Sequence, residues 1–295
     1  MRLFGPQPSA ALLLAFLCAL LPAAAAPPAD DRGRAPPRTG TASRIVTLAP
    51  ALTELAYAAG AGGKLVGVSA WSDYPEAARR LPQVGDSSRL DAERILLLKP
   101  DLLLAWVSGN PAAEIARLEA LGLPVYAVEP ARLADVPRVL RAIGALAGTG
   151  ADAERAAAEF ERGIAALGVR HGGGRPVSVF YEIWDEPLLT VSGEHIISDV
   201  IRLCGGRNVF ADAPLLTPAV SWESLLAANP EVIFASVSAD NEAAARKLRK
   251  APSLRAAARG RVYSVPADYI QRATPRILEG ARRVCEALEG VRGER

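Results

Sequence analysis

The sequence contains few of the side chains that usually carry out chemistry. Its 295 residues include two histidines, three cysteines and 5% aromatic residues. A zinc or manganese site is expected to use several histidine and carboxylate ligands, and two histidines without paired spacing do not supply them. We therefore predict no metal site.

A charge excess of one sign is also missing, because 34 lysine and arginine residues stand against 32 aspartate and glutamate residues. No dense basic run with interleaved aromatic residues occurs, which argues against a nucleic-acid partner. Nor is there a Gly-x-Ser-x-Gly elbow, a phosphate loop or a dinucleotide fingerprint. The glycines at 172–174 follow a helical pattern, so they indicate a flexible joint rather than a phosphate cradle. His195 has no identifiable catalytic partner, and we predict no catalytic residue and no enzyme.

Long apolar runs are limited to the N-terminus, where residues 10–21 are almost entirely apolar and follow a single charge at Arg2. A run of about 12 residues is too short for a membrane-spanning helix, which needs about 20. A short apolar run between a basic start and small residues is typical of a secretory signal. We predict a cleaved signal peptide over residues 1–25, with Ala26 as the next best cleavage point, and export to the periplasm. The alternative is an uncleaved anchor.

The cysteines agree with export. Cys18 lies inside the apolar run and follows Phe16 and Leu17 rather than small residues, so we expect it to leave with the signal instead of carrying a lipid. Cys204 and Cys285 then remain. In an oxidising compartment an even pair predicts one disulfide, and two buried free thiols are the alternative. A disulfide closing a loop of about 80 residues is worth roughly 4 kcal/mol in the chain-entropy model.

The rest of the chain divides into segments of different pattern. Residues 26–43 contain almost no large apolar side chain and predict a disordered tether. Short buried strands alternate with helices over 44–132 and again over 175–290, which predicts an α/β fold with mainly parallel sheets. Residues 133–174 are rich in Ala, Glu, Arg and Leu and predict a helical connector. We expect two lobes joined by a long connecting helix.

An internal repeat relates the two halves. Residues 93–105 (Glu-Arg-Ile-Leu-Leu-Leu-Lys-Pro-Asp-Leu-Leu-Leu-Ala) align with 223–235 (Glu-Ser-Leu-Leu-Ala-Ala-Asn-Pro-Glu-Val-Ile-Phe-Ala). One helix-proline-strand match can arise by chance in α/β proteins, but the order of elements around it matches as well. Two related lobes create a cleft between them, and such clefts are where small ligands bind.

Aromatic side chains are scarce but concentrated at the ends of predicted strands. Core aromatic residues are expected inside helices and strands, whereas these lie where an interlobe cleft would open. Large flat side chains suit a large, partly apolar ligand, and the alternative for each is a lid over its local core. The residues are Trp71, Tyr74, Trp106, Trp184 and Tyr269.

At these positions the chain resembles the periplasmic cobalamin-binding proteins of ABC importers, which are class III solute-binding proteins with lobes joined by one long helix. The resemblance covers residues 44–288. The strings at 72–75 and 105–106, and Cys-Gly-Gly with its late cysteine, are its narrower motifs, whereas the strand-helix strings are shared with siderophore and haem receptors. The matching strings occupy residues 47–56, 67–75, 93–106, 204–210, 218–223 and 272–276.

The resemblance implies roles for several residues. Cys204 and Cys285 match the family's disulfide pair, and Glu223 matches a carboxylate that docks onto arginines of the permease. Trp106 matches a tryptophan that packs on the corrin. The predicted ligand-binding set, which includes an acid near the ligand and loop residues that face the cleft, is Pro50, Trp71, Tyr74, Trp106, Trp184, Asp268 and Tyr269.

Two positions depart from the family pattern. A tryptophan of the family is Thr217 here, which bears on the identity of the ligand. The first-lobe docking carboxylate aligns with Ala112, so we predict that the nearby Glu114 takes its place.

We therefore predict a monomeric, non-catalytic periplasmic protein that captures cobalamin and delivers it to the permease and ATPase of an ABC importer. Cobalamin is the transported ligand, and no cofactor is expected. One alternative is a siderophore, whose anionic complex would pair with Arg272 and Arg276. Another is haem, whose iron would be ligated by Tyr74 or His195. An exported enzyme or a metal chaperone on this fold is the remote alternative.

Overall fold

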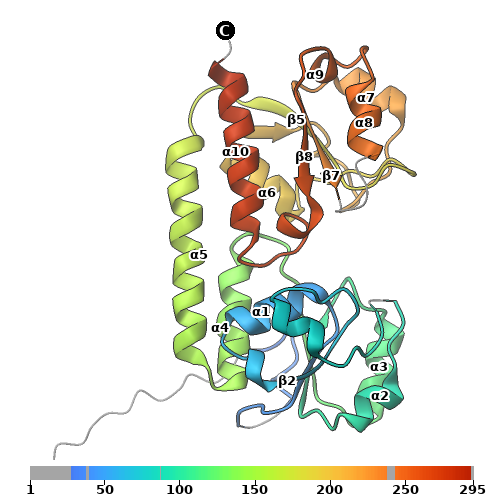
Figure 1. The fold of residues 1–295 in the computed structure, drawn as a ribbon, viewed down its shortest axis with the longest axis vertical. Helices are drawn as coiled ribbons and strands as arrows, with labels where there is room; N and C mark the ends of the chain where they lie inside the picture. Colours follow the sequence, from blue (N-terminus) through green and yellow to red (C-terminus); the bar gives the residue numbers. More distant parts are fainter. Residues whose placement is uncertain (1–27, 38–39, 87, 238–242, 294–295) are drawn as a thin grey trace, which may run out of the picture.

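The computed structural model describes residues 28–37, 40–86, 88–237 and 243–293. The predicted signal peptide and Cys18 lie outside these residues. Within them the chain forms two α/β lobes, one above the other, with two long helices along one side (Figure 1). No helix of the described part is both long and apolar enough to cross a membrane.

The N-terminal lobe is built on a sheet of four parallel strands in the order β2-β1-β3-β4. All four strands are short and almost entirely buried, as expected for strands covered by helices on both faces. The strands are β1 (Ile45–Thr47), β2 (Leu65–Val68), β3 (Leu102–Trp106) and β4 (Val125–Val128), and the lobe's helices are α1 (Pro50–Ala58), α2 (Ala92–Leu97) and α3 (Ala112–Ala120), with 3-10 turns η1 (Gly62–Lys64) and η2 (Glu76–Arg80).

The C-terminal lobe repeats this arrangement. Its parallel sheet has the order β6-β5-β7-β8, in which every strand has the same place as its counterpart in the first lobe. The strands are β5 (Val177–Glu182), β6 (Gly206–Asn208), β7 (Val232–Val237) and β8 (Val262–Pro266), and the helices are α6 (Ile196–Leu203), α7 (Trp222–Ala228), α8 (Ala243–Arg249), α9 (Arg255–Ala258) and α10 (Ile277–Gly293), with the 3-10 turn η3 (Ala267–Tyr269).

The sequence repeat marks the same pair of elements in both lobes. Its copies form α2 with β3 and α7 with β7, and both strands are third in their sheets. The agreement extends to the backbone, because Lys99 (φ 46°) and Asn229 (φ 37°) occupy the same repeat position and both have left-handed conformations after their helices. This conformation commonly ends a helix, and the proline that follows each residue prevents the helix from continuing. The prediction of two related lobes is confirmed.

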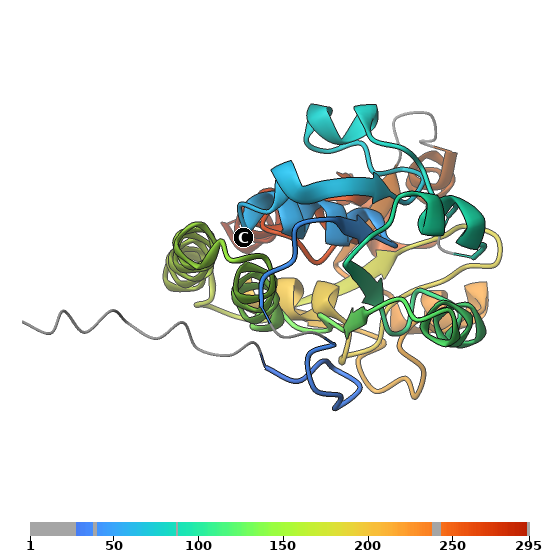
Figure 2. The same ribbon diagram turned by 90° about the horizontal axis from the view of Figure 1, so that it is seen from below.

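The connector consists of two antiparallel helices, α4 (Asp135–Ala147) and α5 (Gly150–His171), which lie side by side when viewed along their axes (Figure 2). Gly144 allows them to approach closely, because a Cβ atom there would lie 2.3 Å from that of Ala153. With 22 residues, α5 is about 33 Å long. It packs on α1 and α4 of the first lobe and on α6 and α10 of the second, so one helix spans both lobes.

The hydrophobic core is continuous behind the cleft. One cluster of buried residues extends from the first sheet through α4 and α5 to the second sheet and α10. Smaller clusters cover the opposite face of each sheet. We expect a connector that is part of the core to resist bending more than an exposed strand hinge does, and therefore to restrict the relative motion of the two lobes.

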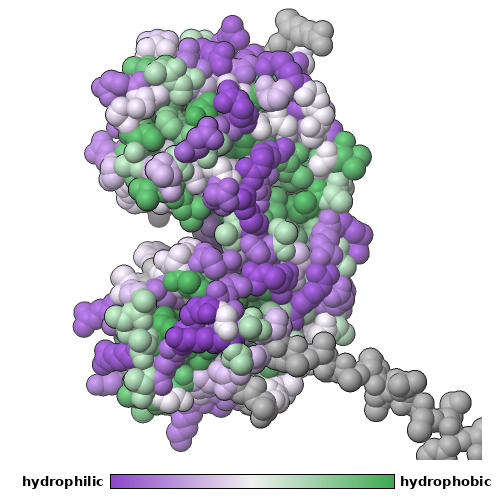
Figure 3. Space-filling view, turned by 180° about the vertical axis from the view of Figure 1, so that it is seen from behind, coloured by the Kyte–Doolittle hydropathy of each residue, from purple (hydrophilic) through white to green (hydrophobic). Residues whose placement is uncertain are grey.

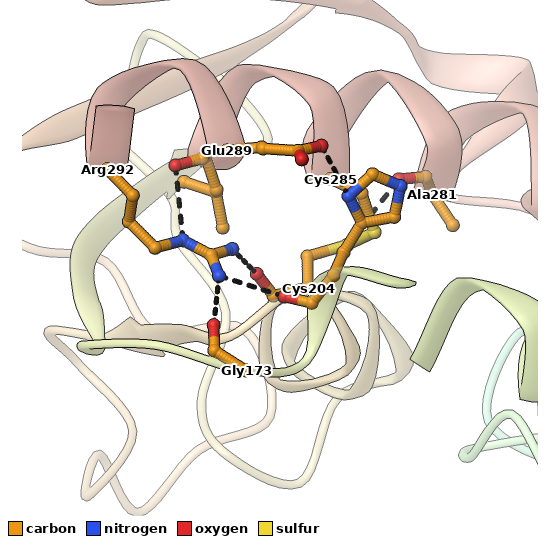
Figure 4. The surroundings of a disulfide bond; sticks show 8 residues. Gly173, Cys204, Ala281, Cys285, Glu289 and Arg292 are labelled. Atoms are coloured by element: carbon orange, nitrogen blue, oxygen red, sulfur yellow. Dashed lines mark hydrogen bonds and ion pairs between the residues drawn. A yellow bond between two sulfur atoms is a disulfide. The ribbon is translucent and has the colours of Figure 1, made fainter. Parts of the chain in front are cut away.

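A disulfide joins Cys204, at the end of α6, to Cys285 in α10, which confirms the predicted pair. The surrounding side chains extend this link to the connector (Figure 4). The Arg292 guanidinium donates to the carbonyls of His171 (2.9 Å), Gly173 and Cys204. The His171 Nδ1 atom lies 2.8 Å from Glu289 Oε2. The C-terminal helix is therefore fixed to both α6 and the end of α5.

The prediction of a disordered tether over 26–43 is wrong for its described part. Asp31 N donates to the Ala127 carbonyl (2.9 Å), beside β4, and the Tyr126 hydroxyl donates to the Pro28 carbonyl (3.2 Å). Arg32 pairs with Glu119 of α3 at 2.8 Å. The segment has little apolar surface to bury, and it is held instead by ion pairs and backbone hydrogen bonds, which composition alone does not reveal.

Candidate interlobe ligand site

A cleft lies between the lobes and opens on the side of the molecule away from α5, where the space-filling view shows a deep indentation (Figure 3). The pocket within this cleft has a volume of about 770 Å³, including space open to solvent. The first lobe contributes the start of α1 and the loops after β3 and β4, through Ala49, Pro50, Ala51, Leu52, Trp106, Ser108, Glu129, Pro130 and Ala131. The second lobe contributes the start of α6 and two loops, through His195, Ile196, Leu216, Gln271, Arg272 and Ala273.

Trp106 lies in this cleft as the last residue of β3, with 37% of its surface exposed. Its indole nitrogen donates to Glu129 Oε1 at 3.1 Å, and its backbone nitrogen donates to Asn110 Oδ1 at 2.8 Å. Gly109 makes room for the ring, because a Cβ atom there would lie 1.8 Å from it. The hydrogen bonds to Glu129 and Asn110 and the close approach of Gly109 therefore hold the ring in place, while part of its surface stays open to the cleft.

Glu129 was not among the predicted site residues, although it directly follows β4 at the edge of the sheet. Besides the Trp106 indole, it accepts hydrogen bonds from the backbone nitrogen (2.7 Å) and hydroxyl (3.0 Å) of Ser108. Its own backbone nitrogen donates to Asp31 Oδ2. Glu129 thus links the N-terminal segment to the loop that carries Trp106. Its position at a strand end is the sequence signal that could have found it.

The other predicted aromatic residues are not among the side chains that line this pocket, although the Trp71 carbonyl accepts a hydrogen bond from Arg272 at 3.3 Å. Trp71 and Trp184 are 78% and 60% exposed. The Trp71 backbone is left-handed (φ 64°), in a turn held by the adjacent Ser72 hydroxyl, which hydrogen-bonds Thr53 at 2.9 Å. The Trp184 indole donates to the Glu186 carbonyl at 2.9 Å. Both rings remain open to solvent, each on a different lobe.

Tyr74 and Tyr269 are brought together, but through an arginine. The Arg276 guanidinium lies 4.1 Å from the centre of the Tyr74 ring and 4.7 Å from that of Tyr269, so both tyrosines make cation–π contacts with one charge. Tyr74 belongs to the first lobe and Tyr269 to the second. Together with Glu54 and Tyr57, Tyr74 borders a separate hollow beside the cleft.

Next to these rings, an ion-pair cluster crosses the lobe boundary. Glu54 of α1, whose side chain is 2% exposed, pairs with Arg272 (2.8 Å) and Arg276 (3.0 Å) of the second lobe. Arg272 also pairs with Asp73 (2.9 Å) and with Asp268 (2.8 Å). Burial alone would lower the pKa of Arg272, but its hydrogen bonds to Asp73 and Glu54 raise it above the usual value. Arg272 is therefore a fully charged group surrounded by carboxylates.

His195 has a structural role at the wall of the cleft. It is the N-cap of α6, and its Nδ1 atom accepts a hydrogen bond from the Ile197 backbone nitrogen at 3.1 Å. Burial lowers the pKa of His195 to about 4, so the imidazole is neutral near pH 7. Within the described residues, no group of three or more His, Cys, Asp or Glu side chains is placed to hold a metal ion.

A family model described as periplasmic binding protein matches residues 45–269. The chain belongs to this family. The vitamin B12-binding protein of Vibrio parahaemolyticus is 37% identical over 254 residues, which cover 85% of this chain and 91% of the relative. The vitamin B12-binding protein of Yersinia pseudotuberculosis is 36% identical over 289 residues, which cover 97% and 95%.

Two solved structures extend the comparison. The periplasmic vitamin B12 binding protein BtuF of Vibrio cholerae matches with a TM-score of 0.78 and 36% identity, over 86% of this chain and 99% of that one. The periplasmic heme-binding protein RhuT from Roseiflexus in its apo form matches with a TM-score of 0.74 and 27% identity, over 85% and 99%. The two-lobed architecture is thus common to relatives that are named for different ligands.

The two predicted docking carboxylates of this periplasmic binding protein lie on different lobes, on the side away from α5 (Figure 1). Glu223 is an exposed residue in the first turn of α7, and hydrogen bonds from its own amide and from Ser221 lower its pKa. Glu114 is in the first turn of α3, half-buried in a polar hollow that also contains Arg117. The first turn of α7 therefore exposes its carboxylate to solvent, whereas the carboxylate in the first turn of α3 is half-buried.

Proposed function

We propose that this protein binds cobalamin, or a closely related corrinoid, in the interlobe cleft and delivers it to the permease and ATPase of an ABC importer. The observation that carries the proposal is the partly open ring of Trp106 in a cleft between two lobes. A corrin is a large ring with an apolar face, and an aromatic side chain held at its edge offers a flat surface to such a ring. Relatives named vitamin B12-binding protein, which are similar over most of both chains, support the same ligand.

The charges around the cleft favour this ligand over a siderophore. A siderophore site would offer arginines to an anionic complex, and Arg272 and Arg276 were the candidates. Both already pair with the buried carboxylate of Glu54, and Arg272 has two further carboxylate partners. Releasing these arginines to a ligand would leave a buried carboxylate without its partners, which is costly. A ligand without net negative charge avoids this cost.

The candidate haem ligands are also engaged. The Tyr74 ring stacks on the Arg276 guanidinium, and His195 uses Nδ1 to cap α6. A haem iron would therefore have to break a cation–π contact or approach the second ring nitrogen of a buried, neutral histidine. Neither requirement applies to cobalamin, whose cobalt carries its own axial ligands and needs no side chain from the protein.

Delivery is supported by the predicted export and by the acidic side chains at the starts of α3 and α7. The predicted signal peptide would place the mature chain in the periplasm, and the family is that of periplasmic binding proteins. Glu223 and Glu114 would pair with basic residues of the permease, one from each lobe. Because α5 is packed into the core of both lobes, we expect capture to involve limited closure rather than a wide hinge motion.

The direct test is a titration of the purified mature chain with cyanocobalamin, in which binding is measured by isothermal calorimetry and by quenching of tryptophan fluorescence. We expect saturable binding with one corrinoid per chain. Hemin and a ferric catecholate siderophore serve as competing ligands in the same assay. Saturable binding of either one, with no response to cyanocobalamin, would contradict the proposal.

A further inference from the structure

The cluster has three ion pairs between the lobes, and the buried carboxylate of Glu54 takes part in two of them, with Arg272 and with Arg276. The third joins Asp73 to Arg272. Glu54 lies on α1 of the first lobe, and its partners lie between η3 and α10 of the second. One carboxylate oxygen accepts from Arg272 (2.8 Å) and Arg276 (3.0 Å), and the other accepts from the Thr274 hydroxyl (2.8 Å). Both oxygens of Glu54 thus contact the opposite lobe.

The position of Glu54 decides which charges the cleft presents. Arg272 lines the cleft, whereas Glu54 lies behind it, in the wall of the neighbouring hollow. Around Arg272 and Arg276 are three carboxylates, those of Glu54, Asp73 and Asp268, so the cluster has a net charge of −1 by count. Arg272 in the cleft and Arg276 in the neighbouring hollow are thereby presented without excess positive charge.

We propose that Glu54 is a positioning residue that sets ligand selectivity. Its buried carboxylate holds Arg272 and Arg276 across the lobe boundary and neutralises them, so that the cleft accepts a corrinoid and rejects tetrapyrroles that carry free carboxylates. This inference rests on the proposed function for the identity of the preferred ligand. It adds a specific cause for the preference, because Arg276 without its carboxylate partner would favour an anionic ring.

The expected consequence is a gain of binding, which a purely structural residue would not produce. Glu54→Gln removes one negative charge and leaves the side chain almost the same size. Arg276 then loses its carboxylate partner, whereas Arg272 keeps Asp73 and Asp268, and the net charge of the cluster changes from −1 to 0 by count. We expect the dissociation constant for hemin to fall by about tenfold or more, the scale of one charge-assisted hydrogen bond. The affinity for cyanocobalamin should fall, because the arginines are no longer held in place. The new hemin binding should weaken as salt concentration rises.

The experiment compares Glu54→Gln with the wild-type protein in titrations with cyanocobalamin and hemin, after circular dichroism has confirmed folding. Glu93→Gln is the matched control, because it removes the same charge from an exposed side chain in the first turn of α2, on the same lobe. An unchanged preference in folded Glu54→Gln, or an equal gain of hemin binding in Glu93→Gln, would overturn the inference.

If Glu54→Gln does not fold, Asp73→Asn tests the same idea at a partly exposed position, because Asp73 pairs with Arg272 and its side chain is 37% exposed. We expect the same change of preference with a smaller amplitude, and no change would refute the inference. Failure of the proposed function is distinguishable from these outcomes, because it would appear as absent cyanocobalamin binding by the wild-type protein. The hemin titrations of the variants still decide the role of Glu54 in that case.

Discussion

The two lobes share a strand order but are stabilised by different means. In the second lobe, a disulfide and the Arg292 side chain fix α10 to α6 and to the end of the connector. In the first lobe, an N-terminal segment lies beside β4, held by the Arg32–Glu119 and Arg138–Asp31 ion pairs. The periphery of one lobe is therefore held by a covalent bond and that of the other by ion pairs. A duplicated fold can thus keep its sheet topology while its peripheral links diverge.

The same difference leads us to expect that affinity and stability depend mainly on different lobes. Trp106 and Glu129 belong to the first lobe, next to the N-terminal segment. The second lobe contributes the arginines of the interlobe cluster and the capped start of α6. We expect perturbations of the second lobe to act mainly on stability, and perturbations of the first-lobe cleft to act mainly on affinity.

Removing the disulfide should have the largest effect. In the variant Cys204→Ala/Cys285→Ala we expect a loss of about 2–5 kcal/mol in the free energy of unfolding, because the unfolded chain regains the entropy of a long loop. Urea unfolding followed by circular dichroism measures this loss. The wild-type protein should lose a similar amount under reducing conditions, while the variant should not respond to the reductant. Equal stability of the wild-type protein in its oxidised and reduced forms would show that the disulfide is not needed to hold α10.

A buried carboxylate in the second lobe should make its stability depend on pH. Burial, with a smaller contribution from the nearby Asp185 charge, raises the pKa of Glu182 to about 7, and Lys247 opposes the shift. Glu182 is 2% exposed, and its Oε2 atom has no hydrogen-bond partner within the described residues. The folded chain thus keeps a proton that the unfolded chain releases near pH 4.5.

The sign follows from this proton. Between about pH 4.5 and 7 the folded state binds more protons than the unfolded state, so the Glu182 contribution to stability is complete below this range and decreases as pH rises through it. Glu182→Gln removes the titration. We expect the variant to be more stable than the wild-type protein by about 2–3 kcal/mol at pH 8 and nearly equal at pH 4. Parallel stability curves for the two proteins would contradict the assignment of the proton to Glu182.

In the first lobe, Trp106→Ala should weaken corrinoid binding by about 1–3 kcal/mol, the scale of one large aromatic contact. Its effect on the free energy of unfolding should be smaller, because part of the ring is already exposed. Trp71→Ala is the comparison variant at another predicted ligand-binding residue, since this ring is 78% exposed and is not part of the same pocket lining. The affinities come from calorimetry. An equal loss in both variants would place the ligand against the rim of the lobe rather than in the cleft.

Much of the fold could be predicted from the sequence, because short apolar strands alternate with helices and the repeat fixes the correspondence of the lobes. β6 escaped prediction because Gly206–Asn208 has three residues and no apolar pattern, and its pairing with β5 depends on tertiary contacts. The N-terminal segment was missed for a related reason. Its order depends on Glu119 and Ala127, which are far away in the chain.

The site was predictable in part. Its place at a strand end predicted that Trp106 lies in the cleft, and the structure has it there, since the carboxyl edge of a parallel sheet forms the cleft. The pairing of Tyr74 and Tyr269 through Arg276 could not be read from the sequence, because it joins residues of different lobes. The same applies to Glu54, which in the sequence is a helical residue of α1 with no sign of its partners more than 200 positions away. Interlobe contacts are set by the relative placement of two folded units, and local patterns carry no information about them.

The two predicted docking carboxylates provide the last comparison between the lobes, and the smallest expected effect on affinity. Glu223 is exposed at the start of α7, whereas Glu114 is half-buried and shares its hollow with Arg117. An exposed carboxylate is free to pair with an arginine of another protein, while a half-buried one is less accessible to such a partner. Charge pairs at the rim of an interface mainly steer encounter and fix orientation.

We therefore expect Glu223→Arg to leave cyanocobalamin affinity unchanged and to reduce uptake through the reconstituted importer by about tenfold, the scale of a lost steering charge that becomes repulsive. Glu114→Arg should reduce uptake less. The measurements are a binding titration and a proteoliposome transport assay on each variant. Unchanged uptake with Glu223→Arg would remove α7 from the docking surface, and a larger defect with Glu114→Arg would reverse the order of the lobes.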